Sequence, residues 1–504
     1  MEPIYKSITP ADRWLITIVV MAATLMQVID TTIVNVALPH MQGSLGASPD
    51  EITWTLTSYL VSSAIFMPLT GYLADTLGRK KYLVLSIVGF TVVSGLCGAA
   101  TSLPEMVVFR LLQGVFGAAL VPLSQAIMTD IFPPEERGKA MAIWGVGVMV
   151  GPILGPTLGG YLTEVASWRW TFYVNVPVGI FTLLLTNVIP EWKAHPRGID
   201  WLGLMYISFT IGGLQYVLDR GNSADWFNST SICIITYLTI SSFFFFILHN
   251  INRQGPRVFD LRIFKDSNFT LACVLLCLFG LGMYGMMVVQ PLMTEGLFNY
   301  PVLTAGLLMA PRGISSMVSM IIITRLITRV DPRILIAIGI CFCIIGLWFC
   351  TFYSINVNTF WLVFPMIIQG LGLGMVFVPL ATIAFSTLPG EYRTEAAGLY
   401  SLVRTIGGSI GISVTMTFYT RKAQLFWNQL GGFIQPFNPA FHQYLQSMHL
   451  NTSTTMNTVL LSAELMRQSN MMSFLNVFAF IMWCFIVMLP MLLLLKKNKA
   501  VTVR

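Results

Sequence analysis

Long runs of apolar residues, separated by polar segments, recur from one end of the chain to the other. A helix needs about 20 apolar residues to cross the hydrocarbon core of a bilayer, and fourteen stretches meet that requirement. They lie at residues 14–38, 52–73, 82–101, 105–129, 140–163, 170–189, 201–219, 231–250, 269–291, 303–328, 333–353, 359–383, 394–418 and 474–495. The pattern predicts an all-α integral membrane protein with fourteen spans.

Composition agrees with this interpretation and narrows the range of possible functions. The 504 residues are 55% hydrophobic and only 10% charged, whereas soluble domains carry about 25% charged residues. The eight cysteines fall inside apolar runs, where they are expected to be small packing residues. We find no Cys/His metal spacing, no nucleophile with a base and no phosphate-binding loop. The chain is therefore expected to be no enzyme and to hold no metal or cofactor, so an ion gradient or a partner must supply energy for any transport.

Basic residues are unequally distributed among the segments that join the spans. With the N-terminus in the cytoplasm, 21 of the 29 lysines and arginines lie on the cytoplasmic side, five on the other side and three within spans. This positive-inside bias places both termini in the cytoplasm. It also explains the net charge of +7 without a nucleic-acid partner. By parity, the polar segment 420–473 lies outside the cytoplasm, where its length makes contact with a partner protein a working hypothesis.

An internal repeat divides the chain. Gln113-Gly114 and Gln369-Gly370 are 256 residues apart, and the same offset carries Gly151 to Gly407. Transporters are often built from two parallel halves of six helices. The offset spans eight predicted helices, which implies two additional helices between the halves, at 201–219 and 231–250.

The repeat predicts a three-part organisation. Residues 1–190 form a six-helix N-terminal half, and residues 191–268 hold the two additional central helices and a linker. Residues 269–504 form the six-helix C-terminal half, which includes the extracytoplasmic loop 420–473.

The stretch GVMVGPILGPTLGG, at residues 147–160, places four glycines at four-residue intervals. The glycines share one face of a helix, and two prolines interrupt it. These residues are Gly147, Gly151, Pro152, Gly155, Pro156 and Gly159. One interpretation is a tight packing seam between helices; the other is a seam at which helices move or seal. The glycines at 151 and 155 recur in the second half but the prolines do not, so packing is assigned to the glycines and a directional role to the prolines.

Asp30 is the one carboxylate placed well inside a predicted span. An ionisable group there is costly to insert and normally faces the interior of the bundle. Gln27, Thr31 and Asn35 form a polar stripe beside it. Asp30 is either half of a permanent ion pair or a proton carrier. Arg110, which cannot release its proton, is the candidate cation, although the sequence does not settle whether the two side chains meet.

Further polar residues are expected to line a central substrate cavity. Arg110 and Gln113 share one helix face with two glycines. Arg312 and Arg404 also lie within spans, where they either pack against carbonyls and snorkel or bind anionic groups of a substrate. The expected cavity residues are Gln27, Thr31, Asn35, Gln113, Arg312 and Arg404.

The loop between the second and third spans contains a Gly-x-x-x-Asp-x-x-Gly-Arg arrangement, formed by Gly71, Asp75, Gly78 and Arg79. The carboxylate is able to cap a helix or pair with an arginine, and Gly78 permits a tight turn.

With these motifs the chain resembles the major facilitator superfamily, and within it the 14-helix drug:proton antiporters of the EmrB/QacA type. The resemblance rests on DTTIVNVALP from Asp30, the loop motif, Arg110-Leu-Leu-Gln113-Gly114, the Gly/Pro stretch, and WRWTFYVNVP from Trp168. It implies that the loop motif gates the cytoplasmic side, that Arg110 takes part in proton coupling and that the Gly/Pro stretch marks an antiporter. EmrB-type members work with a periplasmic adaptor and an outer-membrane channel.

The resulting prediction is a proton-coupled exporter of lipophilic compounds in the bacterial inner membrane, with Asp30 and Arg110 in coupling. Some 14-helix relatives carry an acidic residue where this chain has Arg312, which puts a second coupling carboxylate in doubt. Two alternatives remain: an uptake transporter of the same fold, disfavoured by the Gly/Pro stretch, and a non-transporting membrane sensor, disfavoured by the lack of an appended soluble domain.

Overall fold

A computed structural model describes residues 8–133, 136–191, 198, 200–253, 255, 257–258, 260–327, 329–389, 392–435, 437–447 and 455–496. Within these ranges the chain is helical and contains no strand. The helices of the first part are α1 (Pro10–Leu45), α2 (Pro49–Ile52), α3 (Trp54–Phe66), η2 (Met67–Leu69), α4 (Thr70–Leu77), α5 (Arg79–Ala99), α6 (Leu103–Gly117), α7 (Leu120–Ile131), α8 (Arg137–Val165), α9 (Trp170–Tyr173) and α10 (Asn175–Leu185). The remaining helices are η4 (Thr186–Val188), α11 (Trp201–Arg220), η5 (Trp226–Asn228), α12 (Thr230–Asn252), η6 (Leu261–Lys265), α13 (Ser267–Pro291), η7 (Leu292–Leu297), α14 (Val302–Leu326), α15 (Pro332–Cys350), α16 (Thr359–Ser386), α17 (Arg393–Gly431), α18 (Pro439–Ser447), α19 (Thr455–Met491) and η9 (Leu492–Leu494).

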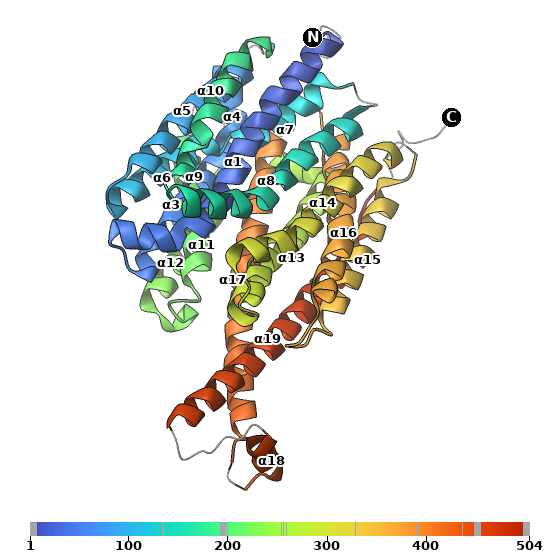
Figure 1. Ribbon diagram of the computed structural model, residues 1–504. Coiled ribbons are helices and arrows are strands. Elements are labelled where there is room, and N and C mark those ends of the chain that lie inside the picture. Colours follow the sequence, from blue (N-terminus) through green and yellow to red (C-terminus); the bar gives the residue numbers. More distant parts are fainter. Residues whose placement is uncertain are drawn as a thin grey trace.

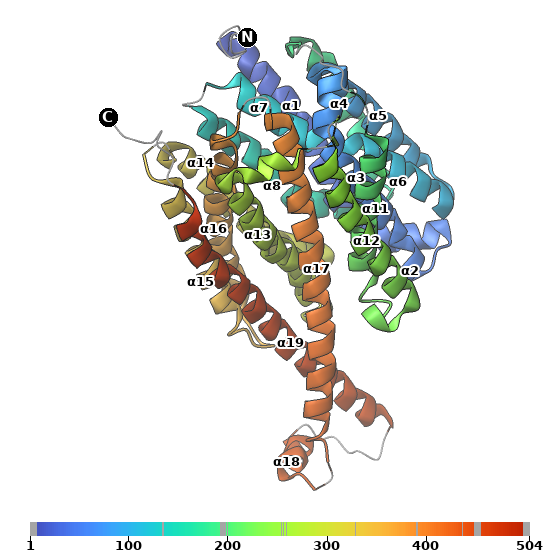
Figure 2. The same ribbon diagram turned by 180° about the vertical axis from the view of Figure 1, so that it is seen from behind.

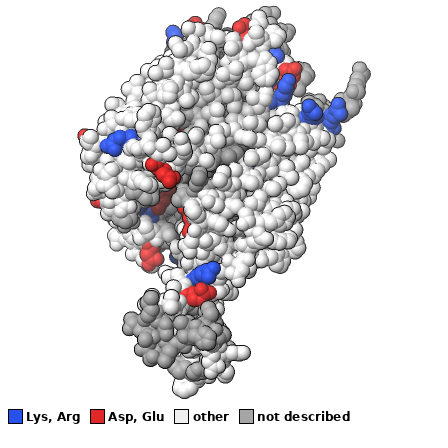
Figure 3. Space-filling view, viewed as in Figure 1, with Lys and Arg blue, Asp and Glu red and all other residues white. Residues whose placement is uncertain are grey.

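The predicted number of spans is confirmed. In the described part of the chain, twelve helices are long and apolar enough to cross a bilayer. The other two are α8 and α17, with 29 and 39 residues. They lie within the same bundle (Figure 1), and α17 carries more polar residues than the other spans. Most of the face seen in Figure 3 carries no Lys, Arg, Asp or Glu, as a lipid-facing surface requires.

The described residues of the predicted polar loop 420–473 are largely helical. α17 continues past the predicted end at 418 because no glycine or proline interrupts it before Gly431. α19 begins at Thr455, well before the apolar run. Both helices extend beyond the bundle on the side away from the start of α1, and α18 lies at their tip (Figures 1 and 2). We call the end where α1 begins and η9 ends the terminal end of the bundle.

The internal repeat is visible in how helices pair. α1 packs along α8 and α3 along α6, while α13 packs along α17 and α14 along α16. Equivalent glycines make equivalent contacts: a Cβ on Gly114 would stand 2.5 Å from the Tyr59 carbonyl oxygen, and one on Gly370 would stand 2.9 Å from the Arg312 carbonyl carbon. Each glycine therefore lets two backbones approach more closely than any side chain would allow.

The four-residue glycine seam of α8 packs against α1. A Cβ on Gly151 would stand 2.8 Å from Val28 Cβ, and one on Gly159 would stand 2.7 Å from the Ile33 carbonyl oxygen. The Thr32 hydroxyl lies between the two helices, 3.1 Å from the carbonyl oxygen of Gly151. α8 continues through Pro152 and Pro156, whose side chains lie outside the described part, so the role assigned to these prolines stays a prediction.

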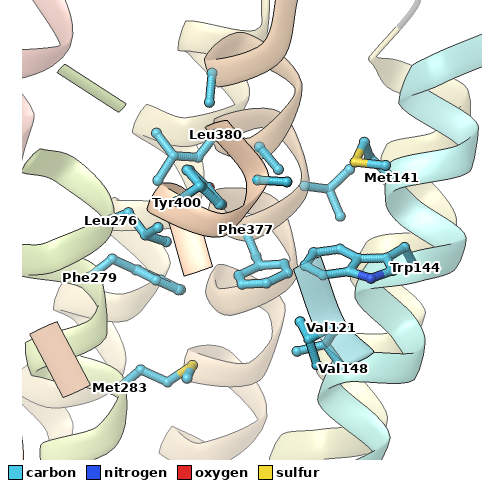
Figure 4. Packing of buried hydrophobic residues seen from close by; sticks show 14 of the residues in the cluster. Val121, Met141, Trp144, Val148, Leu276, Phe279, Met283, Phe377, Leu380 and Tyr400 are labelled. Carbon is cyan, nitrogen blue, oxygen red and sulfur yellow. The ribbon is translucent and has the colours of Figure 1, made fainter. Parts of the chain in front are cut away.

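α8 also contacts two helices of the second repeat, α14 and α16. Trp144 stacks on Phe377 of α16, with ring centroids 5.8 Å apart. A Cβ on Gly138 would stand 2.7 Å from Ile327, just after α14. Figure 4 shows the Trp144–Phe377 pair between α8 and α16, with Phe279 and Met283 of α13 on the other side of Phe377. We call α1–α10 the first set of helices and α13–α19 the second set. α8 thus connects α1 to the second set of helices.

The two additional helices lie at the edge of the bundle. α12 packs on α11, and α11 lies against both α3 and α17 (Figure 2). The Ser409 hydroxyl of α17 donates to Gln215 Oε1 of α11 at 2.9 Å. α11 therefore touches both sets of helices.

Candidate functional site

Asp30 and Arg110 form an ion pair inside the first set of helices. Arg110 Nη1 donates to Asp30 Oδ2 at 2.7 Å, and both residues are 0% exposed. The contact that the sequence left open is therefore made. A buried charge is tolerated when it is paired and hydrogen-bonded, and these two residues satisfy both conditions.

Two amides complete the hydrogen bonding of the carboxylate. Gln113 Nε2 and Asn175 Nδ2 donate to Asp30 Oδ1 at 2.9 and 3.0 Å. Asn175 also donates to Ser94 Oγ at 3.1 Å, which connects α10 to α5. Three helices, α1, α6 and α10, therefore meet at one carboxylate, and each of its oxygens accepts at least one hydrogen bond.

Arg110 is held independently of Asp30. Its Nη1 also donates to Gln113 Oε1 at 2.8 Å, and its Nε donates to the Thr55 carbonyl oxygen of α3 at 2.9 Å. The guanidinium carbon lies 4.3 Å from the centroid of the Tyr59 ring, within range of a cation–π contact. Protonation of Asp30 would remove the negative charge yet leave the arginine in place.

The three predicted cavity residues of α1 differ in the exposure of their side chains and in their hydrogen-bond partners. Gln27 is buried and its Oε1 accepts from the Val121 backbone N–H at 3.1 Å, which ties α1 to α7. Thr31 donates to the Val28 carbonyl oxygen within its own helix. Asn35 is exposed and donates to the Thr31 carbonyl oxygen at 3.4 Å. Their assignment to a cavity stays a prediction, as does that of Gln113.

The two arginines of the second set of helices lack an acidic partner within the described residues. Arg312 Nη1 donates to Gln290 Oε1 at 3.0 Å. The guanidinium carbon of Arg404 lies 5.9 Å from the centroid of the Trp144 ring. Among the residues that the structure describes, neither arginine forms a salt bridge, whereas Arg110 is neutralised by Asp30.

Residues of the loop motif meet the second set of helices at the terminal end. Gly78, with φ 86°, joins α4 to α5. A Cβ on Gly71 would stand 2.7 Å from Glu395 Cα. Arg79 pairs with Asp130 at the end of α7, and Arg393 Nη1 lies 3.1 Å from the other oxygen of Asp130. Asp75 lies on α4, one turn before Gly78.

The network extends to the segment before α13, because the Asp260 backbone N–H donates to Glu395. We call Arg79, Asp130, Arg393 and Glu395 the terminal network. It joins both sets of helices through side chains.

Sequence reasoning missed two groups of these residues. Asn175 stands inside the quoted WRWTFYVNVP stretch, but an asparagine near a helix start gives no signal of its partner. Asp130 ends α7, and its spacing to Arg79 and Arg393 carries no periodicity. The 256-residue offset of the repeat carries Arg137 to Arg393, but it names no partner for either arginine.

Comparisons with known proteins agree with this architecture. The family model "Major Facilitator Superfamily" matches residues 20–412. The chain is 36% identical to the multidrug export protein EmrB of Escherichia coli K12, over 86% of this chain and 85% of that protein. It is 34% identical to EmrB of Haemophilus influenzae, over 90% of each chain.

A solved structure supports the fold alone. The human organic anion transporter MFSD10 superposes with a TM-score of 0.62 at 14% identity, covering 95% of this chain and all of that one. The family model, which matches residues 20–412, spans the helices that hold the Asp30–Arg110 pair. The chain therefore belongs to the major facilitator superfamily and, within it, to the family of the EmrB-type multidrug exporters.

Proposed function

We propose that this chain is a proton-coupled antiporter that exports lipophilic compounds across the bacterial inner membrane by alternating access. The observation that carries the proposal is the Asp30–Arg110 pair: a carboxylate in the dry interior whose charge is balanced by one guanidinium. The multidrug export named for its EmrB relatives supports the direction of transport.

Proton binding at Asp30 would change the contacts among its helices. The charged carboxylate holds Arg110, Gln113 and Asn175 through three hydrogen bonds. Charge-assisted hydrogen bonds are stronger than neutral ones, so neutral Asp30 holds α6 and α10 less firmly. Arg110 keeps its bonds to Gln113 and to the Thr55 carbonyl oxygen. It therefore sets the charge balance without itself carrying the proton.

The contacts of α8 connect the helix that carries Asp30 to the helices of the second half. α1, which carries Asp30, lies against the glycine seam, and α8 also lies against α14 and α16. A shift of α1 is therefore passed to a helix that touches both halves. In this proposal residues 1–190 and 269–504 move as two bodies, with residues 191–268 between them.

The terminal network is assigned the role of the cytoplasmic gate. Its residues join the two halves at the end of the bundle where α1 begins. Both termini are then cytoplasmic, in keeping with the distribution of basic residues. The opposite extension formed by α17, α18 and α19 would lie in the periplasm, where we assign it to contact with an adaptor and, through it, an outer-membrane channel.

The test uses inside-out vesicles that have been acidified internally. Addition of an exported drug is expected to release protons through the unmodified protein. Asp30→Asn should abolish that release, while drug binding and drug–drug exchange persist because the amide keeps the shape of the site. Thr17→Ala on the same helix serves as the control, because the Thr17 hydroxyl donates to the Arg13 carbonyl oxygen within α1, and it should behave like the unmodified chain. Drug-driven proton release by Asp30→Asn contradicts the proposal, and proton uptake with substrate indicates an importer.

A further inference from the structure

A cavity of about 420 Å³ is lined by residues of α2, α3, α11 and α12. It lies where α11 ends at Arg220 and α12 begins at Thr230, at the end of the bundle opposite the terminal end (Figure 2). Both helices are long and apolar enough to cross a bilayer, so the cavity lies at the depth at which two spans leave the hydrocarbon. Its volume falls within the range of small-molecule sites in proteins.

Charges of both signs line this cavity. Arg220, at the end of α11, contributes a guanidinium, and Glu51 of α2 contributes a carboxylate. The Ser48 backbone N–H and the Ser48 hydroxyl donate to Glu51 Oε2 at 2.9 and 2.8 Å, and these bonds hold the pKa of Glu51 below its usual value. Glu51 is therefore ionised at neutral pH, and the cavity offers one positive and one negative group.

Two aromatic rings position the guanidinium. The guanidinium carbon of Arg220 lies 4.8 Å from the centroid of the Trp54 ring, within range of a cation–π contact, and the Tyr216 ring lies 5.9 Å from the Trp54 ring. Tryptophan and tyrosine are enriched at the boundary between hydrocarbon and water. The planar guanidinium presents paired N–H donors that match the oxygens of a phosphate.

Hydroxyl groups complete the polar part of the cavity wall. Ser223, Ser229 and Ser231 line the cavity together with the two charged residues. A purely lipophilic compound placed here would remove water from the charges and hydroxyls without bonding to them, which is unfavourable. A ligand that carries both a phosphate and an amine would instead match Arg220, the hydroxyls and Glu51 at once.

The surface of α12 adds an apolar contact for the same ligand. Ile232 lines the cavity, and Ile234, Tyr237 and Leu238 follow it on α12, each more than half exposed. Apolar side chains exposed on a membrane-spanning helix face lipid tails. An acyl chain would lie against them while its headgroup fills the cavity, whereas a water-soluble phosphate compound would use the polar wall alone.

We propose that this cavity binds the headgroup of a zwitterionic phospholipid with a primary amine, such as phosphatidylethanolamine. Arg220 and the serine hydroxyls hold the phosphate, Glu51 holds the ammonium group, and the acyl chains lie against α12. The bound lipid joins α3 to the two additional helices. The inference goes beyond the proposed transport function and does not depend on it, because no residue of the Asp30–Arg110 site takes part.

The experiment measures lipid binding to the purified full-length chain by native mass spectrometry. Three dioleoyl lipids share their acyl chains and differ in the headgroup: phosphatidylethanolamine carries both charges, phosphatidylglycerol carries the phosphate alone, and dioleoylglycerol carries neither. The unmodified chain should bind phosphatidylethanolamine most tightly and dioleoylglycerol least. Arg220→Gln should weaken phosphatidylethanolamine roughly tenfold, because a charge-assisted hydrogen bond is lost, and should leave dioleoylglycerol within about twofold. Unchanged dioleoylglycerol binding shows that the variant is folded.

Three further variants separate the two charges from general packing. Arg220→Lys keeps the charge and should recover part of the affinity for phosphatidylethanolamine. Glu51→Gln should remove the preference for phosphatidylethanolamine over phosphatidylglycerol. Arg169→Gln is the matched control, because Arg169 also lies over a tryptophan ring, that of Trp168 at 4.4 Å, but lies outside the cavity. It should bind all three lipids as the unmodified chain does.

Several outcomes overturn the inference. They are equal binding of phosphatidylethanolamine and dioleoylglycerol by the unmodified chain, an undiminished affinity of Arg220→Gln for phosphatidylethanolamine, and an equal loss in Arg169→Gln. A last measurement adds phosphoethanolamine, which is the same headgroup without acyl chains. If it displaces the lipid as effectively as phosphatidylethanolamine does, the cavity takes a soluble phosphate compound and the assignment to a lipid is wrong.

Discussion

The substitution Gly155→Ala tests the seam between α8 and α1 directly. The added Cβ would overlap the Thr32 hydroxyl, stand 2.8 Å from Thr32 Cβ and 3.2 Å from the Ile33 backbone nitrogen. The Ile33 nitrogen belongs to the backbone, which cannot move away by changing a side-chain rotamer. Alanine gains about 1 kcal/mol over glycine in helix propensity, whereas overpacking of a tight interior costs about 1–3 kcal/mol. We therefore expect a net loss of about 1 kcal/mol.

Gly160→Ala, five residues along the same helix, is the matched control. Its Cβ would meet only Val36 Cγ1 at 3.8 Å, an ordinary contact, so the propensity gain should remain. The assay is the thermal unfolding midpoint of the purified protein in detergent, together with drug efflux from cells. Gly155→Ala should lower the midpoint and reduce efflux, Gly160→Ala should do neither, and Thr32→Ala should restore part of the loss. Equal midpoints for the two glycine variants would refute the assignment of the seam to α1.

Two further perturbations address the charged networks. Asp130→Ala removes the shared partner of Arg79 and Arg393. Because a partly exposed ion pair contributes about 1 kcal/mol, the ratio of molecules closed to molecules open at the terminal end should fall roughly fivefold. Crosslinking of a Gly138→Cys/Ile327→Cys pair measures that shift, and unchanged crosslinking contradicts it. Arg110→Gln leaves the buried Asp30 carboxylate without its cation, at a cost of about 3–5 kcal/mol. Adding Asp30→Asn should restore folded protein, as detergent size-exclusion yield will show, without restoring proton-driven efflux.

Several features of this protein followed from local sequence pattern. Apolar runs of bilayer length located fourteen spans, since a span must satisfy its own backbone hydrogen bonds in lipid. Asp30 and Arg110 stood out because an ionisable residue in an apolar run is costly and therefore paired. The glycine spacing placed one bare face on α8. Each of these conclusions depends only on residues within one helix.

Which helices face one another was decided by tertiary structure. The contact of Arg110 with Asp30 joins residues 80 positions apart, and Asn175 reaches the same carboxylate from a third helix. The glycines from 147 to 159 meet α1 of their own half, while Trp144, one turn before Gly147 on α8, meets the second half. Helical periodicity fixes which residues share a face but carries no information about the partner of that face. In a bilayer that choice depends on close packing and polar contacts between helices, which exist only once the bundle has assembled.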